Sequence, residues 1–219
     1  MREGCAVLDL GVQEYGETWE FQKRLVAQRL EGRVPDTLLL VEHPPVYTVG
    51  RRGGEEDLAG LELPVYHVER GGEVTYHGPG QLVGYPIMGL PKGKLEIKAF
   101  IAALEEVLIR TATDLGISGE RGVHAGLWVG PKKLASIGVA VRHHVTYHGF
   151  ALNVNNDLAP FLDVCPCGLD GSALTSMTEV LGRNVSVEAV KPSLLRHFAE
   201  VFDRDVVPSP EPMTAVLRS

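Results

Sequence analysis

The chain has 219 residues, of which 44% are hydrophobic and 22% charged, and its formal net charge is −7. This length fits a single domain over residues 1–219 that buries a substantial core. No apolar run approaches the roughly 20 residues that a membrane-spanning helix needs. The acidic balance leaves no basic stripe for nucleic-acid phosphates. Because the three cysteines are an odd number and the N-terminus lacks signal-peptide features, we expect a cytoplasmic protein without a disulfide framework.

The N-terminal half predicts one helix among several strands. Apolar side chains recur at helical spacing in residues 17–31. Segments of strand length and composition are residues 6–10, 37–42, 65–70, 73–77 and 81–88. We expect His43-Pro44-Pro45 to leave regular structure and Gly71-Gly72 to form a hairpin turn.

The C-terminal half predicts two helices and further strands. One helix is expected over residues 97–115 and the last over 187–203, where Pro192 is tolerable only near the first turn. Strand-like segments are residues 124–129, 134–141 and 145–154. Residues from about 204 to 219 are proline-rich and expected to form an irregular tail. Because strands cluster in hairpins, we expect an α+β fold with a mixed, mostly antiparallel sheet flanked by helices.

Cys167 is the candidate nucleophile. It stands between Pro166, which fixes the direction of the chain, and Gly168, which leaves the sulfur accessible. The alternative is a small buried residue at a turn. Cys165 is the local competitor, and Cys5 is expected to be inert.

Lys133 is the candidate base. It begins the apolar segment 134–141, so its side chain is expected to lose solvation and acquire a lowered pKa. Its neighbour Lys132 is expected to be a solvated charge. An ammonium close to a thiol favours the reactive thiolate.

A glycine-rich segment, residues 70–81, is the third candidate element. Its glycines let backbone amides approach a ligand, although the spacing matches neither the phosphate-loop nor the dinucleotide motif, and a structural hairpin remains the alternative. Val-Thr-Tyr-His-Gly occurs at residues 74–78 and again at 145–149. The flanking residues differ, so we infer no duplication, but the two strands are expected to bring His77 and His148 to one pocket. No histidine spacing predicts a metal site.

Four motifs in this order resemble those of the lipoyl(octanoyl) transferases of lipoate biosynthesis. They are residues 70–81, 133–138, 148–154 and 166–168. The resemblance implies the fold of the catalytic domains of lipoate and biotin protein ligases. It also implies transfer of an octanoyl group from octanoyl-acyl carrier protein to a lysine of a lipoyl domain, without metal or cofactor. The implied acceptors are the lipoyl domains of 2-oxoacid dehydrogenase complexes and the glycine cleavage H protein.

The same resemblance assigns roles to individual residues. Cys167 would form the acyl thioester, and Lys133 would activate it. The residues implied to line the acyl site are Arg70, Gly71, Gly72, Glu73, Val74, Thr75, Tyr76, His77, Ser136, Ile137, Gly138, His148, Gly149, Phe150 and Ala151.

Other functions remain open from the sequence. A lipoate- or biotin-type ligase would activate a free acid with ATP and would need no nucleophilic cysteine; a thioesterase or a non-catalytic acyl-binding protein are further alternatives. Both expected protein partners are acidic, so the entrance of a transferase must be locally basic. The basic candidates are Arg51, Arg52, Lys92, Lys94, Lys98, Lys132 and Arg142.

Overall fold

The computed structural model describes residues 2–53, 62–91, 96–164 and 173–209. Among them, seven strands form the main sheet in the order β10-β1-β2-β6-β9-β8-β7. These strands are β1 (Glu3–Val12), β2 (Asp36–Glu42), β6 (Gln81–Ile87), β7 (Gly126–Val129), β8 (Lys132–Arg142), β9 (Val145–Asn153) and β10 (Arg204–Pro208). Strand β1 is parallel to β2 and β10, and the other pairs are antiparallel, which confirms the predicted sheet.

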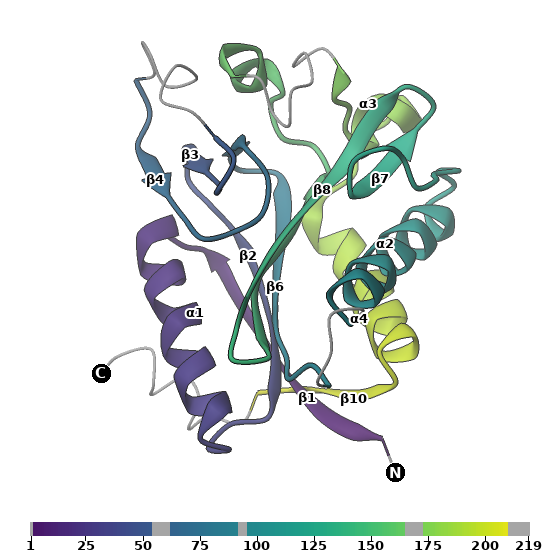
Figure 1. Ribbon diagram of the computed structural model, residues 1–219. Helices are drawn as coiled ribbons and strands as arrows, with labels where there is room; N and C mark the ends of the chain where they lie inside the picture. Colours follow the sequence, from purple (N-terminus) through teal and green to yellow (C-terminus); the bar gives the residue numbers. More distant parts are fainter. Residues whose placement is uncertain (1, 54–61, 92–95, 165–172, 210–219) are drawn as a thin grey trace.

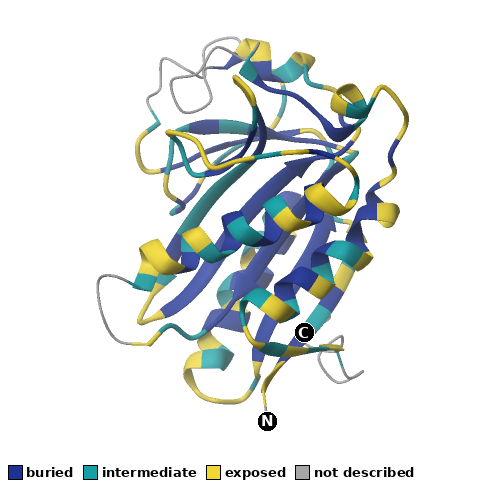
Figure 2. Ribbon diagram, turned by 90° about the vertical axis from the view of Figure 1, so that its right-hand side faces the viewer, coloured by how far each residue is buried: buried dark blue, intermediate teal, exposed yellow. Residues whose placement is uncertain are grey.

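Helices cover both faces of this sheet (Figure 1). Helix α1 (Tyr15–Leu30) packs on one face, and α2 (Glu96–Asp114) and α4 (Val187–Val201) pack on the other. The predicted periodicities for these three helices are confirmed to within a few residues. Figure 2 shows the result, with buried strands behind helices whose outer sides are exposed.

A smaller sheet of three strands lies beside the main one and corrects the predicted hairpin. Its order is β4-β3-β5, with β3 (Val46–Val49), β4 (Val65–His67) and β5 (Val74–His77). Strand β3 pairs in parallel with β4 and antiparallel with β5. The hairpin prediction around Gly71-Gly72 was therefore wrong, because β3, a buried strand of only four residues directly after Pro44-Pro45, lies between the two expected partners.

The C-terminal tail departs from its prediction in part. Residues 204–208 were expected to be irregular, but they form β10 and add an edge strand parallel to β1. Pro208 is tolerated there because an edge strand need not donate every backbone N–H. Residues 210–219 lie outside the described part of the chain.

Two short helices were not predicted, and one proline sits deeper in its helix than expected. The unpredicted elements are the 3-10 helix η2 (Ala159–Asp163) and α3 (Met177–Leu181). Pro192 is the sixth residue of α4, beyond the first turn. Its exposed position allows water to solvate the Glu188 carbonyl, which loses its helical N–H donor.

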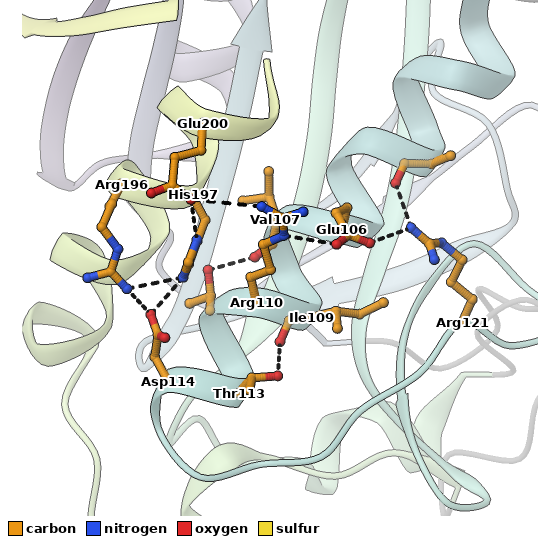
Figure 3. A network of polar contacts seen from close by, with 12 residues as sticks. Glu106, Val107, Ile109, Arg110, Thr113, Asp114, Arg121, Arg196, His197 and Glu200 are labelled. Atoms are coloured by element: carbon orange, nitrogen blue, oxygen red, sulfur yellow. Dashed lines mark hydrogen bonds and ion pairs between the residues drawn. The ribbon is translucent and has the colours of Figure 1, made fainter. Parts of the chain in front are cut away.

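A polar network joins α2 to α4 at the surface (Figure 3). Asp114, at the end of α2, accepts hydrogen bonds from Arg196 and from His197, whose Nε2 lies 2.7 Å away. Arg110 adds an ion pair to Glu200 at 3.8 Å. These partly exposed ion pairs are individually weak, but together they hold α2 and α4 against each other, away from the cavity described below.

No helix in the described ranges has both the length and the apolar character needed to cross a lipid bilayer.

Candidate active site

A cavity opens where the small sheet meets the centre of the main sheet. Its empty space is about 490 Å³ when the open mouth is included. The residues that line it are Tyr15, Arg70, Gly71, Thr75, His77, Val83, Tyr85, Ser136, Ile137, Gly138, His148, Gly149, Phe150 and Ala151. The structure thus brings three separate predicted segments to one cavity, and it places His77 and His148 in the same pocket.

Strand β5 contributes only alternate residues to the cavity. Thr75 and His77 line it, whereas Val74 and Tyr76 point to the opposite side of the strand. Tyr76 packs there against Phe161, with ring centroids 5.3 Å apart. The period of two along a strand explains the division, and Val74 and Tyr76 therefore lie outside the lining of this cavity.

Gly72 and Glu73 were also expected in the acyl site, and their backbones have a different role. The Gly72 carbonyl accepts from the Arg52 amide at 3.0 Å, and the Glu73 carbonyl accepts from the Gly50 amide at 3.0 Å. Neither residue lines the cavity. They hold the basic 50–52 loop beside it instead.

Two glycines allow backbones to meet around the cavity. A Cβ added at Gly138 would lie 3.0 Å from the Gly71 carbonyl oxygen, and one at Gly149 would collide with the Gly84 carbonyl oxygen of β6. The Gly71 amide donates to the Val139 carbonyl at 3.1 Å. Side chains at these positions would push the glycine-rich segment or β6 away and deform the cavity.

Arg70 connects the small sheet to the glycine-rich backbone that lines the cavity. It is buried, with Nη2 donating to the Thr48 carbonyl at 2.6 Å and Nη1 donating to the Gly71 carbonyl at 3.0 Å. The guanidinium therefore brings a permanent positive charge to the cavity lining.

Tyr15, Val83 and Tyr85 line the cavity but were not predicted as site residues. Val83 and Tyr85 follow Gln81 at a spacing of two on β6, so the period of that strand carried a signal for their shared face. His43, which does not line the cavity, holds the Tyr85 side chain through a hydrogen bond. Its Nδ1–H donates to the Gln13 carbonyl at 2.7 Å, so its Nε2 accepts from the Tyr85 hydroxyl at 2.8 Å.

His77 is held as a neutral ring in the cavity wall. Burial, followed by the nearby His43, lowers its pKa to about 3, against the opposing hydrogen bond to Gln81. Its Nδ1 lies 2.7 Å from Gln81 Oε1, and its ring stacks on Tyr15 at 5.8 Å between centroids. At neutral pH it can offer one N–H and one lone pair.

His148 has an unusual backbone and an unpaired ring. Its φ is 55°, a left-handed conformation that residues other than glycine seldom adopt. Neither ring nitrogen has a hydrogen-bond partner, since Glu69 Oε2 is 3.5 Å from Nε2, too far for a normal hydrogen bond. Burial, and then the Arg70 charge, lower the pKa of His148 to about 4.

Lys133 is buried at the start of β8, with only 2% of its surface exposed. Its Nζ lies 5.6 Å from the centroid of the Trp128 ring, which allows a cation–π contact. The Lys133 backbone pairs with Leu174, and its carbonyl accepts from the Thr175 amide at 3.1 Å. The predicted burial is confirmed; its catalytic role stays a prediction.

Cys165 and Cys167 lie outside the described residues. Cys5, the remaining cysteine, is fully buried in the core. Burial and the Asp36 carboxylate raise its pKa to about 12, which leaves it a poor nucleophile. Among the residues with a described position, no three His, Cys, Asp or Glu side chains converge as metal ligands do.

The fold and the cavity match one class of protein. Residues 14–199 match the family described as Lipoyl protein ligase A/B catalytic domain, and the chain belongs to this family. Solved structures of the same fold include a bi-partite lipoate protein ligase from Thermoplasma acidophilum, at a TM-score of 0.77 and 17% identity, covering 100% of this chain and 91% of that one. Biotin protein ligase from Aquifex aeolicus has a TM-score of 0.53 at 15% identity, covering 93% of this chain and 70% of that one.

Relatives of higher identity specify the branch of the family. The octanoyltransferase of Syntrophobacter fumaroxidans is 45% identical over 91% of both chains. That of Alkaliphilus metalliredigens is 43% identical, covering 94% of this chain and 98% of its own length. The chain is accordingly an acyltransferase of the octanoyltransferase group, and the predicted resemblance is confirmed.

Proposed function

We propose that this enzyme transfers an octanoyl group from octanoyl-acyl carrier protein to the lysine of a lipoyl domain, through a thioester on Cys167. The observation that carries the proposal is the buried Lys133 on β8, the strand whose next residues line the cavity with Ser136, Ile137 and Gly138. The names of relatives at 43–46% identity support octanoyl transfer.

The reaction proceeds in two steps. The Cys167 thiolate attacks the donor thioester carbonyl, a new thioester forms on Cys167, and the carrier leaves as a thiolate that takes a proton from the Lys133 ammonium. The acceptor amine then attacks this thioester, an amide forms, and the Cys167 thiol is regenerated. Lys133 as an ammonium stabilises the thiolate in the first step, and as a neutral amine it takes the proton of the attacking ammonium in the second.

The cavity is suited to hold the acyl chain between these steps. Val83, Ile137, Phe150 and Ala151 give it apolar surface, and each buried methylene contributes about 0.8 kcal/mol to binding. Lipoyl domains as acceptors are supported by the Thermoplasma acidophilum ligase of the same fold, which was solved in a study with its E2 lipoyl domain.

An ATP-dependent ligase is the alternative, because the structure of lipoate-protein ligase A bound with ATP has the same fold. Its TM-score is 0.73 at 16% identity, and the match covers 100% of this chain and 93% of that one. A ligase would use free octanoate and ATP, whereas the proposed transferase uses a thioester and no nucleotide.

Intact-protein mass spectrometry tests the proposal. The enzyme is mixed with octanoyl-acyl carrier protein, and the lipoyl domain is withheld. We expect a mass increase of one octanoyl group replacing one hydrogen, formed without ATP and removed by hydroxylamine. Activity that requires ATP and free octanoate would support the ligase. Full transfer without any adduct in rapid-quench samples would support direct transfer between the two proteins.

A further inference from the structure

A chain of buried side-chain amides connects the cavity wall to the backbone beside Lys133. Gln81 and Asn153 lie opposite each other on β6 and β9. Their exposed fractions are 1% and 4%, and neither lines the cavity. Buried amides need partners for both ends, and the partners of these two lie in different parts of the fold.

Each contact along this chain has good hydrogen-bond geometry. His77 Nδ1 lies 2.7 Å from Gln81 Oε1, and Gln81 Nε2 donates to Asn153 Oδ1 at 2.9 Å. Asn153 Nδ2 donates to the Thr175 carbonyl at 3.0 Å. The amide of the same Thr175 donates to the Lys133 carbonyl at 3.1 Å. The series therefore begins on β5 and ends at β8.

The direction of every hydrogen bond follows from the last one. The Thr175 carbonyl can only accept, so the NH₂ group of Asn153 must face it. The Asn153 oxygen then accepts from the NH₂ group of Gln81, and the Gln81 oxygen is left to face His77. A carbonyl oxygen requires a donor, so His77 must carry its proton on Nδ1, and its Nε2 is left with a lone pair.

We propose that Gln81 and Asn153 are positioning residues that hold His77 in the Nδ1–H tautomer and tie its orientation to the backbone of Lys133. Under the proposed function, on which this role rests, His77 Nε2 serves as a hydrogen-bond acceptor for an N–H donor of the bound substrate. The amide chain also keeps the cavity wall in register with the strand that carries the base. Neither amide touches substrate.

Nitrogen NMR on histidine-labelled enzyme reports the tautomer directly. In the wild-type enzyme we expect His77 as a single neutral species, protonated on Nδ1 and deprotonated on Nε2. This measurement needs no variant and no activity, so it holds whether or not the chain transfers octanoate. A wild-type His77 protonated on Nε2 would overturn the inference.

Two variants test the connection. Asn153→Ala frees the Gln81 amide to rotate, so we expect a second His77 tautomer and a fall in kcat of up to about 100-fold. Gln81→Glu places a carboxylate against Nδ1–H, so we expect the His77 titration to move to higher pH, with the acid limb of the rate profile moving in the same direction.

Thr146→Val is the matched control. Thr146 is also buried on β9, and its hydroxyl donates to the Pro86 carbonyl at 2.7 Å, away from the cavity. This change is expected to lower Tm without altering the His77 tautomer or the pH profile. If Asn153→Ala lowers Tm in the same way but retains the wild-type tautomer and kcat, the two amides are structural only, and the positioning role is wrong while the proposed function stands.

Discussion

Thr175 and Lys133 are joined through their backbones, with the Thr175 amide donating to the Lys133 carbonyl at 3.1 Å. Leu174 forms a parallel bridge to Lys133 at the same place. Thr175 follows Cys167 by only eight residues in the sequence. The backbone pairing therefore anchors Leu174 and Thr175 beside the residue that is proposed to act as the base.

The cysteine variants separate nucleophile from scaffold. We expect Cys167→Ala to reduce transfer by at least about 1,000-fold, because no thioester can form. Cys165→Ala should retain activity. Cys5→Ala should also retain activity and lower Tm, since it removes a fully buried side chain from the core. The measurements are steady-state transfer and the intact-mass adduct; an inactive Cys165→Ala beside an active Cys167→Ala would identify the other thiol.

Substitutions at Lys133 separate charge from proton transfer. Lys133→Ala should slow acylation of Cys167, because the thiol loses its cation, and should reduce overall transfer by about 100- to 10,000-fold. Lys133→Arg keeps a positive charge that cannot deprotonate. Acylation should partly survive in this variant while transfer to the lipoyl domain collapses. Single-turnover kinetics of the two steps provide the measurement.

Lys132 is the matched control for these variants. It is exposed on the neighbouring position of β8. Lys132→Ala should leave both steps within about two-fold of wild type, as expected for a solvated surface residue. Equal losses for Lys132 and Lys133 variants would contradict the assigned base.

The sequence predicted most of the framework because long periodic segments determine it. Apolar spacing located α1, α2 and α4, and apolar runs located β1, β2, β6, β8 and β9. The small sheet was missed because β3 has four residues and follows two prolines, and its partners are decided by contacts distant in sequence. Pairing of this kind depends on tertiary packing rather than local propensity.

The sequence indicated which segments form the cavity, but it indicated less well which of their residues line it. The glycine-rich segment and the two His-Gly strands do meet, but the alternation of β5 removes Val74 and Tyr76 from the cavity. Tyr15 was missed because it is the first residue of α1, and no pattern in the sequence indicates that the N-terminal end of this helix lies near β9. Only the assembled fold defines such a neighbour.

The basic loop at residues 50–52 is expected to contact the acidic carrier protein. Arg51 and Arg52 are exposed, and their backbone amides bond to the Arg70 and Gly72 carbonyls at 3.1 and 3.0 Å, beside the cavity. Reversing both charges, Arg51→Glu with Arg52→Glu, should raise KM for the carrier protein about five-fold or more and weaken its salt dependence. Steady-state kinetics at several salt concentrations test this.

A second double variant, Arg2→Glu with Arg33→Glu, is the control, because it changes the net charge equally at another part of the surface. Arg2 and Arg33 are exposed and flank β1 and α1 rather than the loop. Reversing both should leave KM for the carrier protein and its salt dependence unchanged. If both pairs raise KM equally, net charge alone governs association; if the loop pair changes nothing, the loop is not part of the docking surface.

Three buried imidazoles predict a loss of stability in acid. Burial lowers the pKa of His77 to about 3, and those of His43 and His148 to about 4, from 6.5. Below pH 6.5 the unfolded chain therefore binds more protons than the native protein, so stability falls as pH decreases towards 4. The combined loss is on the order of several kcal/mol, measurable as a fall in Tm and as proton uptake on unfolding.

One variant of a buried histidine and one of an exposed histidine test whether the buried rings cause the pH dependence. His148→Gln removes a buried titrating ring and should flatten the dependence of Tm on pH. His67→Gln, at an exposed histidine, should leave the slope unchanged. An unchanged slope in His148→Gln would mean that this ring does not supply the pH dependence.

Ala151 is expected to limit the length of the acyl chain. It lies on β9 between Val83 of β6 and Ser136 of β8 in the sheet register, and all three line the cavity. Ala151→Leu would place three further carbon atoms across this row. We expect kcat/KM for octanoyl-carrier to fall about 10- to 100-fold and that for butanoyl-carrier to change little, since each lost methylene contact costs about 1 kcal/mol.

Ala140→Leu provides the control for overpacking. Ala140 is 5% exposed and belongs with Ala151 to the core beneath α1, but it does not line the cavity. An added side chain there should cost about 1–3 kcal/mol of stability and affect octanoyl and butanoyl transfer equally. If Ala151→Leu likewise lowers both rates by one factor, the enlarged side chain destabilises the enzyme without meeting the acyl chain. A selective loss of octanoyl transfer would instead locate the acyl chain along the row of Val83, Ala151 and Ser136.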